Sequence, residues 1–103
     1  MVTSITDTEK EQIINSPAAI IKYYADWCGS CRLFAPVFKR YSNDEKYQGI
    51  AFFEVNAETN PELRGLGGVT NLPFFATLKN GVVQEAGSFS KEERLVEMLE
   101  KLL

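Results

Sequence analysis

The stretch that decides the fold runs from residue 18 to residue 41 and reads AAIIKYYADWCGSCRLFAPVFKRY. Its first part, Ala18 to Ala25, is a nearly continuous apolar run, which is typical of a β-strand buried on both faces of a sheet. From Cys31 onward, apolar residues recur at the i, i+3, i+4 spacing of an amphipathic helix. Pro36 lies inside this helical pattern and is expected to kink the helix. A buried strand therefore leads almost directly into a helix, whose apolar positions are Leu33, Phe34, Val37, Phe38 and Tyr41.

Patterns on either side of this stretch indicate the other elements. Thr6 and Glu9 form a capping box ahead of a polar helix that should stop near Ser16-Pro17. Asn80-Gly81 stands between two short apolar segments, as in a β-hairpin. The order βαβαβαββα indicates an α/β protein with a central mixed sheet. We expect further strands at 50–55, 74–78 and 82–85, a short helix from Asn60-Pro61, and a last helix with Ser90 and Glu93 as its capping box.

The composition fits one ordinary globular domain and excludes several classes of function. The chain has 103 residues, of which 45% are hydrophobic and 24% charged. The chain has 11 Lys and Arg and 14 Asp and Glu, so it lacks the excess of basic residues that is typical of a nucleic-acid binder. No apolar run approaches the roughly 18 residues of a membrane span, and the start lacks the pattern of a signal peptide. We therefore expect a cytoplasmic protein that contacts neither nucleic acid nor membrane.

The glycines at 65, 67 and 68 invite comparison with a phosphate-binding loop. The pattern G-x-G-x-x-G fails at Thr70, and no strand immediately precedes it. We interpret the three glycines as a turn between a helix and a strand.

The two cysteines, Cys28 and Cys31, define the chemistry. The chain has no histidine, so Ser-His and Cys-His nucleophiles are excluded. A structural zinc site usually needs four Cys or His ligands, which would require a second chain or carboxylate ligands here. A purely structural disulfide would close too short a loop to constrain the unfolded chain much. A redox pair remains the favoured interpretation of this C-x-x-C sequence.

The position of Cys28 at a strand-to-helix junction favours its reactive form. A helix N-terminus carries roughly half a positive charge and unpaired N–H groups, and both stabilise a thiolate. We therefore expect a pKa for Cys28 below the ordinary value of about 8.5. Cys28 is the expected nucleophile, because thiolate is the attacking species in disulfide exchange. Cys31, one turn deeper and less exposed, is the expected resolving thiol.

These motifs together resemble the thioredoxin family over nearly the whole chain. A lone C-x-x-C would be weak evidence, but here it stands within Tyr24 to Arg32, which reads YADWCGSCR. The downstream matches are Ala35-Pro36, Asn60-Pro61, Leu72-Pro73, Lys79-Asn80-Gly81 and Gly87. The resemblance implies a single thioredoxin-like domain over residues 1–103, with helices on both faces of the sheet.

The resemblance also implies an activity and a binding surface. The chain would reduce protein disulfides as a monomer, with no bound cofactor or metal beyond its own Cys28–Cys31 disulfide. Electrons would come from NADPH through a flavin-dependent thioredoxin reductase. The Leu72-Pro73 bond would be cis and face the cysteines, and the backbone of Leu72 would pair with an extended substrate. The implied substrate-binding residues are Trp27, Gly29, Ser30, Leu72, Pro73 and Gly87.

Three positions depart from the family pattern. Ser30 replaces the usual proline, which would loosen the helix start and alter the reduction potential, and Phe74 stands where threonine is more usual. Lys22 replaces a buried aspartate, while Glu54 replaces a lysine on the neighbouring strand, so the two look like a swapped ion pair. One hypothesis is that Lys22 handles the proton of Cys31 or stabilises its thiolate. The other is that Lys22 only reaches solvent and balances the charge of Glu54.

Two alternative functions stay open from the sequence. Ser30 and Lys22 would suit a more oxidising disulfide oxidase or isomerase with the same chemistry. A non-catalytic scaffold or subunit would keep the fold with incidental cysteines, although the retention of both cysteines, Trp27 and Leu72-Pro73 speaks against it.

Overall fold

The sheet is built around a central strand, β2 (Ala18–Tyr24), in a computed structural model that describes all residues from 1 to 103. β2 pairs in parallel with β3 on one side and antiparallel with β4 on the other. The five-stranded order is β1-β3-β2-β4-β5, so the sheet is mixed, as expected. The remaining strands are β1 (Val2–Ser4), β3 (Ala51–Asn56), β4 (Phe74–Lys79) and β5 (Val82–Ser88).

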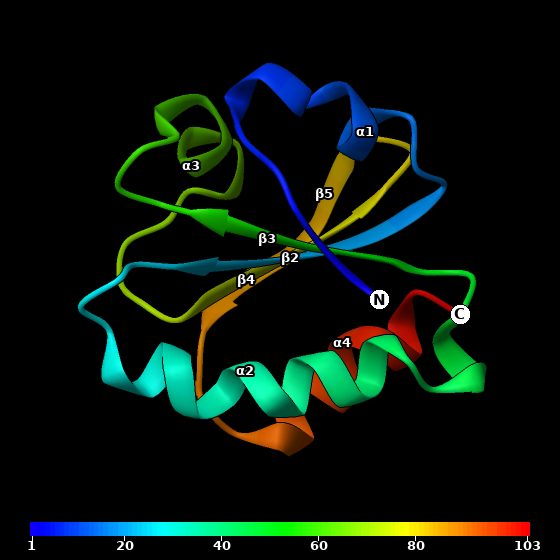
Figure 1. The fold of residues 1–103 in the computed structure, drawn as a ribbon. Coiled ribbons are helices and arrows are strands. Elements are labelled where there is room, and N and C mark those ends of the chain that lie inside the picture. The colour runs from blue at the N-terminus through cyan, green and yellow to red at the C-terminus, as the bar shows by residue number, and fades with distance from the viewer.

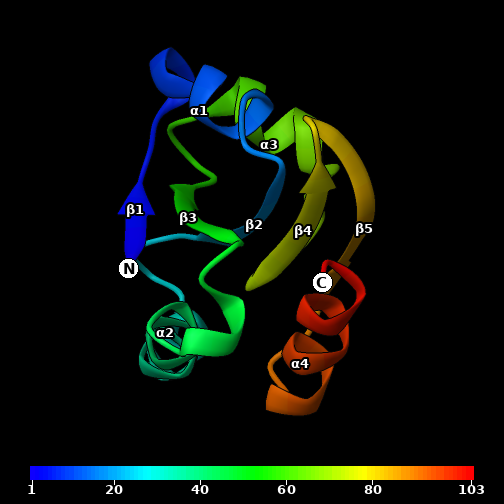
Figure 2. The ribbon, with the colours of Figure 1, turned by 90° about the vertical axis from the view of Figure 1, so that its right-hand side faces the viewer.

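Helices cover both faces of this sheet, and the order βαβαβαββα is confirmed. The helices α2 (Gly29–Ser42) and α4 (Glu92–Lys101) lie against one face, and α1 (Glu11–Ile14) and α3 (Pro61–Gly67) lie against the other (Figures 1 and 2). Short 3₁₀ helices at Asp7–Glu9 and Glu45–Tyr47 complete the connections. No helix has both the length and the apolar character needed to cross a membrane.

The alternation of side chains along β2 divides the core into two clusters. Ile21 and Tyr23 face α1 and α3 and belong to a cluster of 13 buried residues. Ile20 faces α2 and α4 and belongs to a second cluster of 11 buried residues. Lys22 follows Ile20 at the period of two that defines one face of a strand, so it lies on the α2 side of the sheet. The register places Lys22 directly beside Glu54 of β3.

Two local predictions were wrong. Ser90 and Glu93 do not form a capping box, because α4 starts at Glu92 and its N-cap is Lys91 with no side-chain hydrogen bond. Gly65 and Gly67 are not part of a turn but lie within α3. Only Gly68 acts as the turn residue, with a φ of 67° at the helix C-cap, a conformation that glycine adopts without steric cost.

Candidate functional site

The two cysteines are joined by a disulfide at the start of α2. Cys28 is the N-cap residue of α2, and its Sγ accepts a hydrogen bond of 3.2 Å from the backbone N–H of Cys31. The hydroxyl of Ser30 lies 3.5 Å from the same sulfur. The strand-to-helix junction expected from the sequence therefore delivers two polar donors and a helix N-terminus to one sulfur.

Burial does not distinguish the two cysteines in the disulfide form. Cys28 is 4% exposed and Cys31 is 3% exposed, so the lower exposure expected for Cys31 amounts to almost nothing here. Ala25 packs against both residues, and Leu72 packs against this small cluster from the loop before β4. The difference between the cysteines lies in their backbone positions, at the cap and inside the first turn of α2.

Several residues expected to bind substrate lie close to the disulfide in sequence or space. Trp27, the neighbour of Cys28, is 67% exposed, and Gly29 and Ser30 are also exposed. The peptide bond between Leu72 and Pro73 is cis. Pro73 itself is buried, and its carbonyl accepts a hydrogen bond of 2.7 Å from the hydroxyl of Ser88.

Gly87, the last of the expected substrate-binding residues, lies in β5 and not in the segments next to the cysteines. It stands in β5 opposite Phe75, and a Cβ built at Gly87 would meet nothing within 4 Å. The space beside Gly87 is therefore open.

Sequence reasoning missed Glu58, which holds the exposed tryptophan. The indole Nε1 of Trp27 donates a hydrogen bond of 2.8 Å to the carboxylate of Glu58. β2 and β3 are parallel, so the segments that follow them leave the sheet at the same edge. Trp27 follows β2 and Glu58 follows β3, so the parallel pairing of these two strands could have predicted that the two side chains lie close together.

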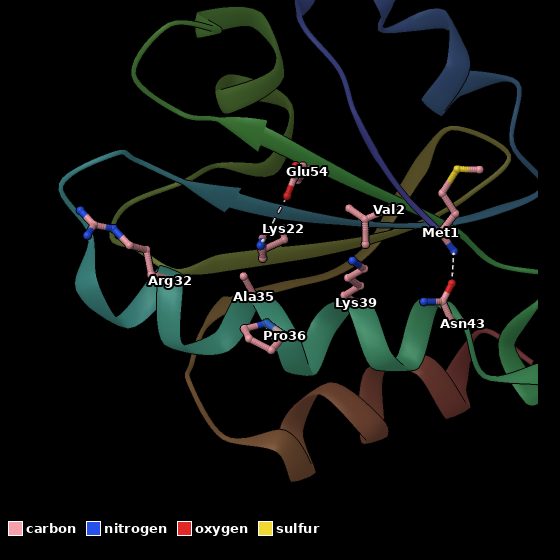
Figure 3. A pocket seen from close by; sticks show the side chains of 9 residues that line it. All are labelled: Met1, Val2, Lys22, Arg32, Ala35, Pro36, Lys39, Asn43 and Glu54. Atoms are coloured by element: carbon pink, nitrogen blue, oxygen red, sulfur yellow. Dashed lines mark hydrogen bonds and ion pairs between the residues drawn. The ribbon is translucent and has the colours of Figure 1, made fainter.

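Lys22 and Glu54 form an ion pair behind the disulfide, with 3.5 Å between Nζ and the carboxylate oxygen (Figure 3). Lys22 is only 4% exposed, and burial lowers its pKa despite the opposing charge of Glu54. The other carboxylate oxygen of Glu54 accepts a hydrogen bond from Ser4. A pocket of about 260 Å³ that opens to the surface is lined by Lys22, Glu54 and Cys31 together, so the ion pair and the second cysteine share one environment.

The site contains no cluster of three or more His, Cys, Asp or Glu side chains that could hold a metal ion. The site presents a disulfide at a helix N-terminus, beside an exposed indole and a loop leucine.

Comparisons with known proteins agree with this chemistry. The sequence matches the thioredoxin family model over residues 1–101. It is 31% identical to a thioredoxin of Listeria monocytogenes over 102 residues, which cover 98% of each chain. The fold is similar to that of Plasmodium falciparum thioredoxin, with a TM-score of 0.86, 26% identity and coverage of 96% of this chain and 97% of the other.

A second solved structure contains a reductase. The chain matches, with a TM-score of 0.85 and 27% identity, a chain from a crystal structure of a complex between ferredoxin:thioredoxin reductase and thioredoxin f2. The match covers 97% of this chain and 93% of the other. The family match, these similarities and the disulfide at the start of α2 lead to one conclusion: the chain belongs to the thioredoxin family of thiol-disulfide oxidoreductases.

Proposed function

We propose that Cys28 is the nucleophile and Cys31 the resolving thiol of a protein-disulfide reductase. The observation that carries these roles is the position of the Cys28 sulfur at the N-cap of α2, where the Cys31 N–H donates to it. In the dithiol form, the same N–H and the Ser30 hydroxyl would stabilise a thiolate on Cys28. Cys31 stands one turn further into the helix, within bonding distance of Cys28.

The reaction consists of two thiol-disulfide exchanges. The Cys28 thiolate attacks one sulfur of a substrate disulfide, which forms a mixed disulfide and releases the other substrate sulfur as a thiolate. The Cys31 thiolate then attacks the sulfur of Cys28 and releases the second substrate thiolate. Two electrons pass from the dithiol to the substrate, both released thiolates are protonated by water, and the protein ends as the Cys28–Cys31 disulfide.

The substrate would bind to a shallow patch around the disulfide. Trp27 offers an exposed apolar face, and Glu58 restrains its indole ring. Leu72 lies outside β4, and its backbone N–H and C=O make no hydrogen bond within the protein. An extended segment could pair with these groups. The small residues Gly29, Ser30 and Gly87 leave room for it, which favours protein substrates over small molecules bound in a deep pocket.

The roles of the two cysteines are tested by single replacements. We expect Cys28→Ser to abolish the reduction of insulin disulfides, because the thiolate at the helix N-cap that makes the first attack is lost. Cys31→Ser should still perform the first exchange and accumulate a mixed disulfide, detected as a mass increase equal to that of the substrate thiol. Normal turnover by Cys28→Ser would overturn the assignment of Cys28, whereas an inactive wild type would favour a non-catalytic role for the domain.

Lys22 would adjust the protonation of Cys31. Because Lys22, Glu54 and Cys31 line one cavity, a charged Lys22 would stabilise the Cys31 thiolate, and a neutral Lys22 would accept its proton. We expect Lys22→Met to shift both the thiol titration of Cys31 and the pH profile of reductase activity. Unchanged profiles would show that Lys22 only balances the charge of Glu54.

The reduction potential decides between a reductase and a more oxidising enzyme. Ser30 in place of proline and a thiolate-stabilising Lys22 would both make the disulfide a better oxidant, because stabilising the reduced dithiol form makes the disulfide accept two electrons more readily. Equilibration with glutathione measures this potential. A value near that of the strongly oxidising members of the fold would assign net oxidation or isomerisation instead.

The dithiol must be regenerated by an external electron donor. The sequence resemblance favours NADPH through a flavin-dependent thioredoxin reductase. The similarity to a thioredoxin f2 complex makes a ferredoxin-dependent reductase the second candidate. NADPH oxidation coupled to insulin reduction, with each reductase supplied in turn, separates the two.

The cellular setting follows from the need to keep the dithiol reduced. Reduced thiols are maintained in the cytosol and oxidised in secretory compartments, so we propose a cytoplasmic location. The net charge of −3 gives no basis for nucleic-acid binding. We further propose that residues 1–103 act as one monomeric domain, because the patch around Cys28 must stay open to receive substrates.

A further inference from the structure

A second and larger groove lies between α2 and the edge of the sheet formed by β1, β3 and β2 (Figure 3). It has a volume of about 760 Å³ and contains none of the residues assigned to the substrate patch. It adjoins the smaller cavity that reaches Cys31, since Lys22, Arg32, Ala35 and Glu54 line both. A ligand in this groove would therefore lie behind the disulfide, on the side of Cys31.

The groove is positively charged on a protein that is negatively charged overall. Its side chains include Lys22, Arg32 and Lys39, with Glu54 as the only carboxylate, while the whole chain carries a net charge of −3. Lys22 pairs with Glu54, so these two charges offset each other. Arg32 and Lys39 are exposed and form no ion pair. Two cationic side chains are thus left without a carboxylate partner.

The spacing of these two cations suits an extended chain. Arg32 and Lys39 are seven residues apart in α2, which corresponds to two helical turns and about 10 Å along the axis. Figure 3 shows Lys39 extending from α2 toward Val2 of β1, and Arg32 extending from the start of α2. Arg32 directly follows Cys31 in the sequence. About three residues of an extended peptide cover this distance. An elongated segment with several carboxylates would therefore meet both cations, whereas a compact ion would meet one.

We propose that this groove binds an acidic segment of the protein partners, with Lys39 and Arg32 as specificity-determining residues. The inference rests on the proposed function, because it places the segment beside the disulfide that is exchanged. A partner with carboxylates next to its reactive disulfide binds more tightly than an otherwise identical neutral partner. The preference weakens as salt screens the exposed charges.

Binding is tested first, on the oxidised protein and without any redox step. The probe is an extended hexapeptide with four glutamates and no cysteine, added to isotope-labelled protein at low ionic strength. We expect amide shifts at Val2, Lys39 and Asn43. Lys39→Glu should weaken binding about tenfold, a change of about 1.4 kcal/mol.

Two controls accompany this titration. The same peptide with four glutamines should not bind. Lys79→Glu should bind the acidic peptide like the wild type, because Lys79 is an exposed, unpaired lysine at the end of β4, two strands away from the β1–β3 side of the groove. Equal binding of both peptides, or equal weakening by Lys39→Glu and Lys79→Glu, would overturn the proposal.

Kinetics with matched substrates then test the link to the reaction. Two disulfide peptides differ only in four glutamates or four glutamines beside the disulfide. We expect kcat/KM to be about fivefold higher for the acidic peptide at low salt, with this ratio falling toward one at high salt or in Lys39→Glu.

The outcomes distinguish failure of the proposed reductase function from failure of the proposed binding groove. If neither peptide is reduced, the proposed reductase function fails, while the binding experiment still decides whether the groove takes an acidic segment. If both are reduced equally at low salt, the reductase function stands and the groove has no part in choosing partners.

Discussion

At the scale of single residues, the most unusual group is the buried cation Lys22. Its ammonium lies 5.5 Å from the centre of the Phe38 ring and 5.9 Å from that of Tyr24, and its only ionic partner is Glu54. Burial lowers the pKa of Lys22, and the attraction of Glu54 only partly opposes this effect. The protonated lysine is therefore less favourable in the folded protein than in the unfolded chain.

This difference predicts a pH dependence of stability. Between the lowered pKa of folded Lys22 and the ordinary value of 10.5, the unfolded chain binds more protons at this position. The free energy of unfolding should therefore rise with pH across this window in the wild type, relative to Lys22→Met. Tyr24 has a raised pKa that is due first to burial, and its opposite contribution is largely shared by both proteins.

Urea unfolding of the oxidised proteins at several alkaline pH values provides the measurement, because disulfide-bonded cysteines do not titrate. Parallel stability profiles for wild type and Lys22→Met would contradict a lowered pKa in the folded state.

Individual side chains differed in how well the sequence predicted them. The proximity of Lys22 and Glu54 was predictable, because neighbouring buried strands bring equivalent positions together. The equal burial of Cys28 and Cys31 was not, because Leu72 covers them from a segment about 40 residues away in the chain. Side-chain burial at a site depends on such distant contacts, which local patterns do not contain.

At the scale of elements, α3 carries two glycines that differ in the room around them: Gly67 has no space for a side chain, and Gly65 has. A Cβ at Gly67 would lie 2.6 Å from the hydroxyl oxygen of Tyr23. Tyr23 cannot easily move, because it is fully buried and its hydroxyl donates a hydrogen bond of 2.7 Å to the carbonyl of Leu63. At Gly65, a Cβ would meet nothing within 4 Å. Of these two glycines, only Gly67 is required by the close approach of α3 to Tyr23 of β2.

Alanine at these two positions should change stability in opposite directions. We expect Gly67→Ala to lower the free energy of unfolding by about 1–3 kcal/mol through overpacking against Tyr23. Gly65→Ala, the matched control in the same helix, should raise it by roughly 0.5–1 kcal/mol, because alanine is the better helix former. Denaturant unfolding measures both, and a tolerated alanine at position 67 would contradict the tight contact.

Elements with strong periodic patterns were predicted well, and their ends less so. β2 and α2 appeared close to their expected limits, because burial on two faces and an amphipathic stripe leave clear signals. The N-cap of α4 was misplaced by one residue, since it is Lys91 and not Ser90. The nearby Phe89 stacks on Phe75 with 4.4 Å between ring centres and packs edge-on against Phe34. These long-range contacts accompany a helix that begins beyond Ser90, which leaves Ser90 unable to cap it.

At the scale of the whole molecule, the two core clusters share one sheet. Ile21 and Leu99 are both fully buried, the first among residues facing α1 and α3 and the second among residues facing α2 and α4. Strands β2, β3 and β4 contribute side chains to both clusters. Loss of packing on either face should therefore destabilise the shared strands and, with them, the disulfide site at the end of β2.

The proposal of one domain over residues 1–103 thus predicts a single unfolding transition. Ile21→Ala and Leu99→Ala should each lower the free energy of unfolding by about 2–5 kcal/mol. The control Leu33→Ala, at a side chain that is 81% exposed, should change it by less than about 0.5 kcal/mol. Circular dichroism follows the helices and strands of the whole domain, whereas the fluorescence of Trp27, the only tryptophan, follows the surroundings of the disulfide. If the domain unfolds in one two-state transition, the two signals change together in every variant. If Leu99→Ala loses its helix signal before its Trp27 fluorescence changes, the two faces of the sheet unfold separately.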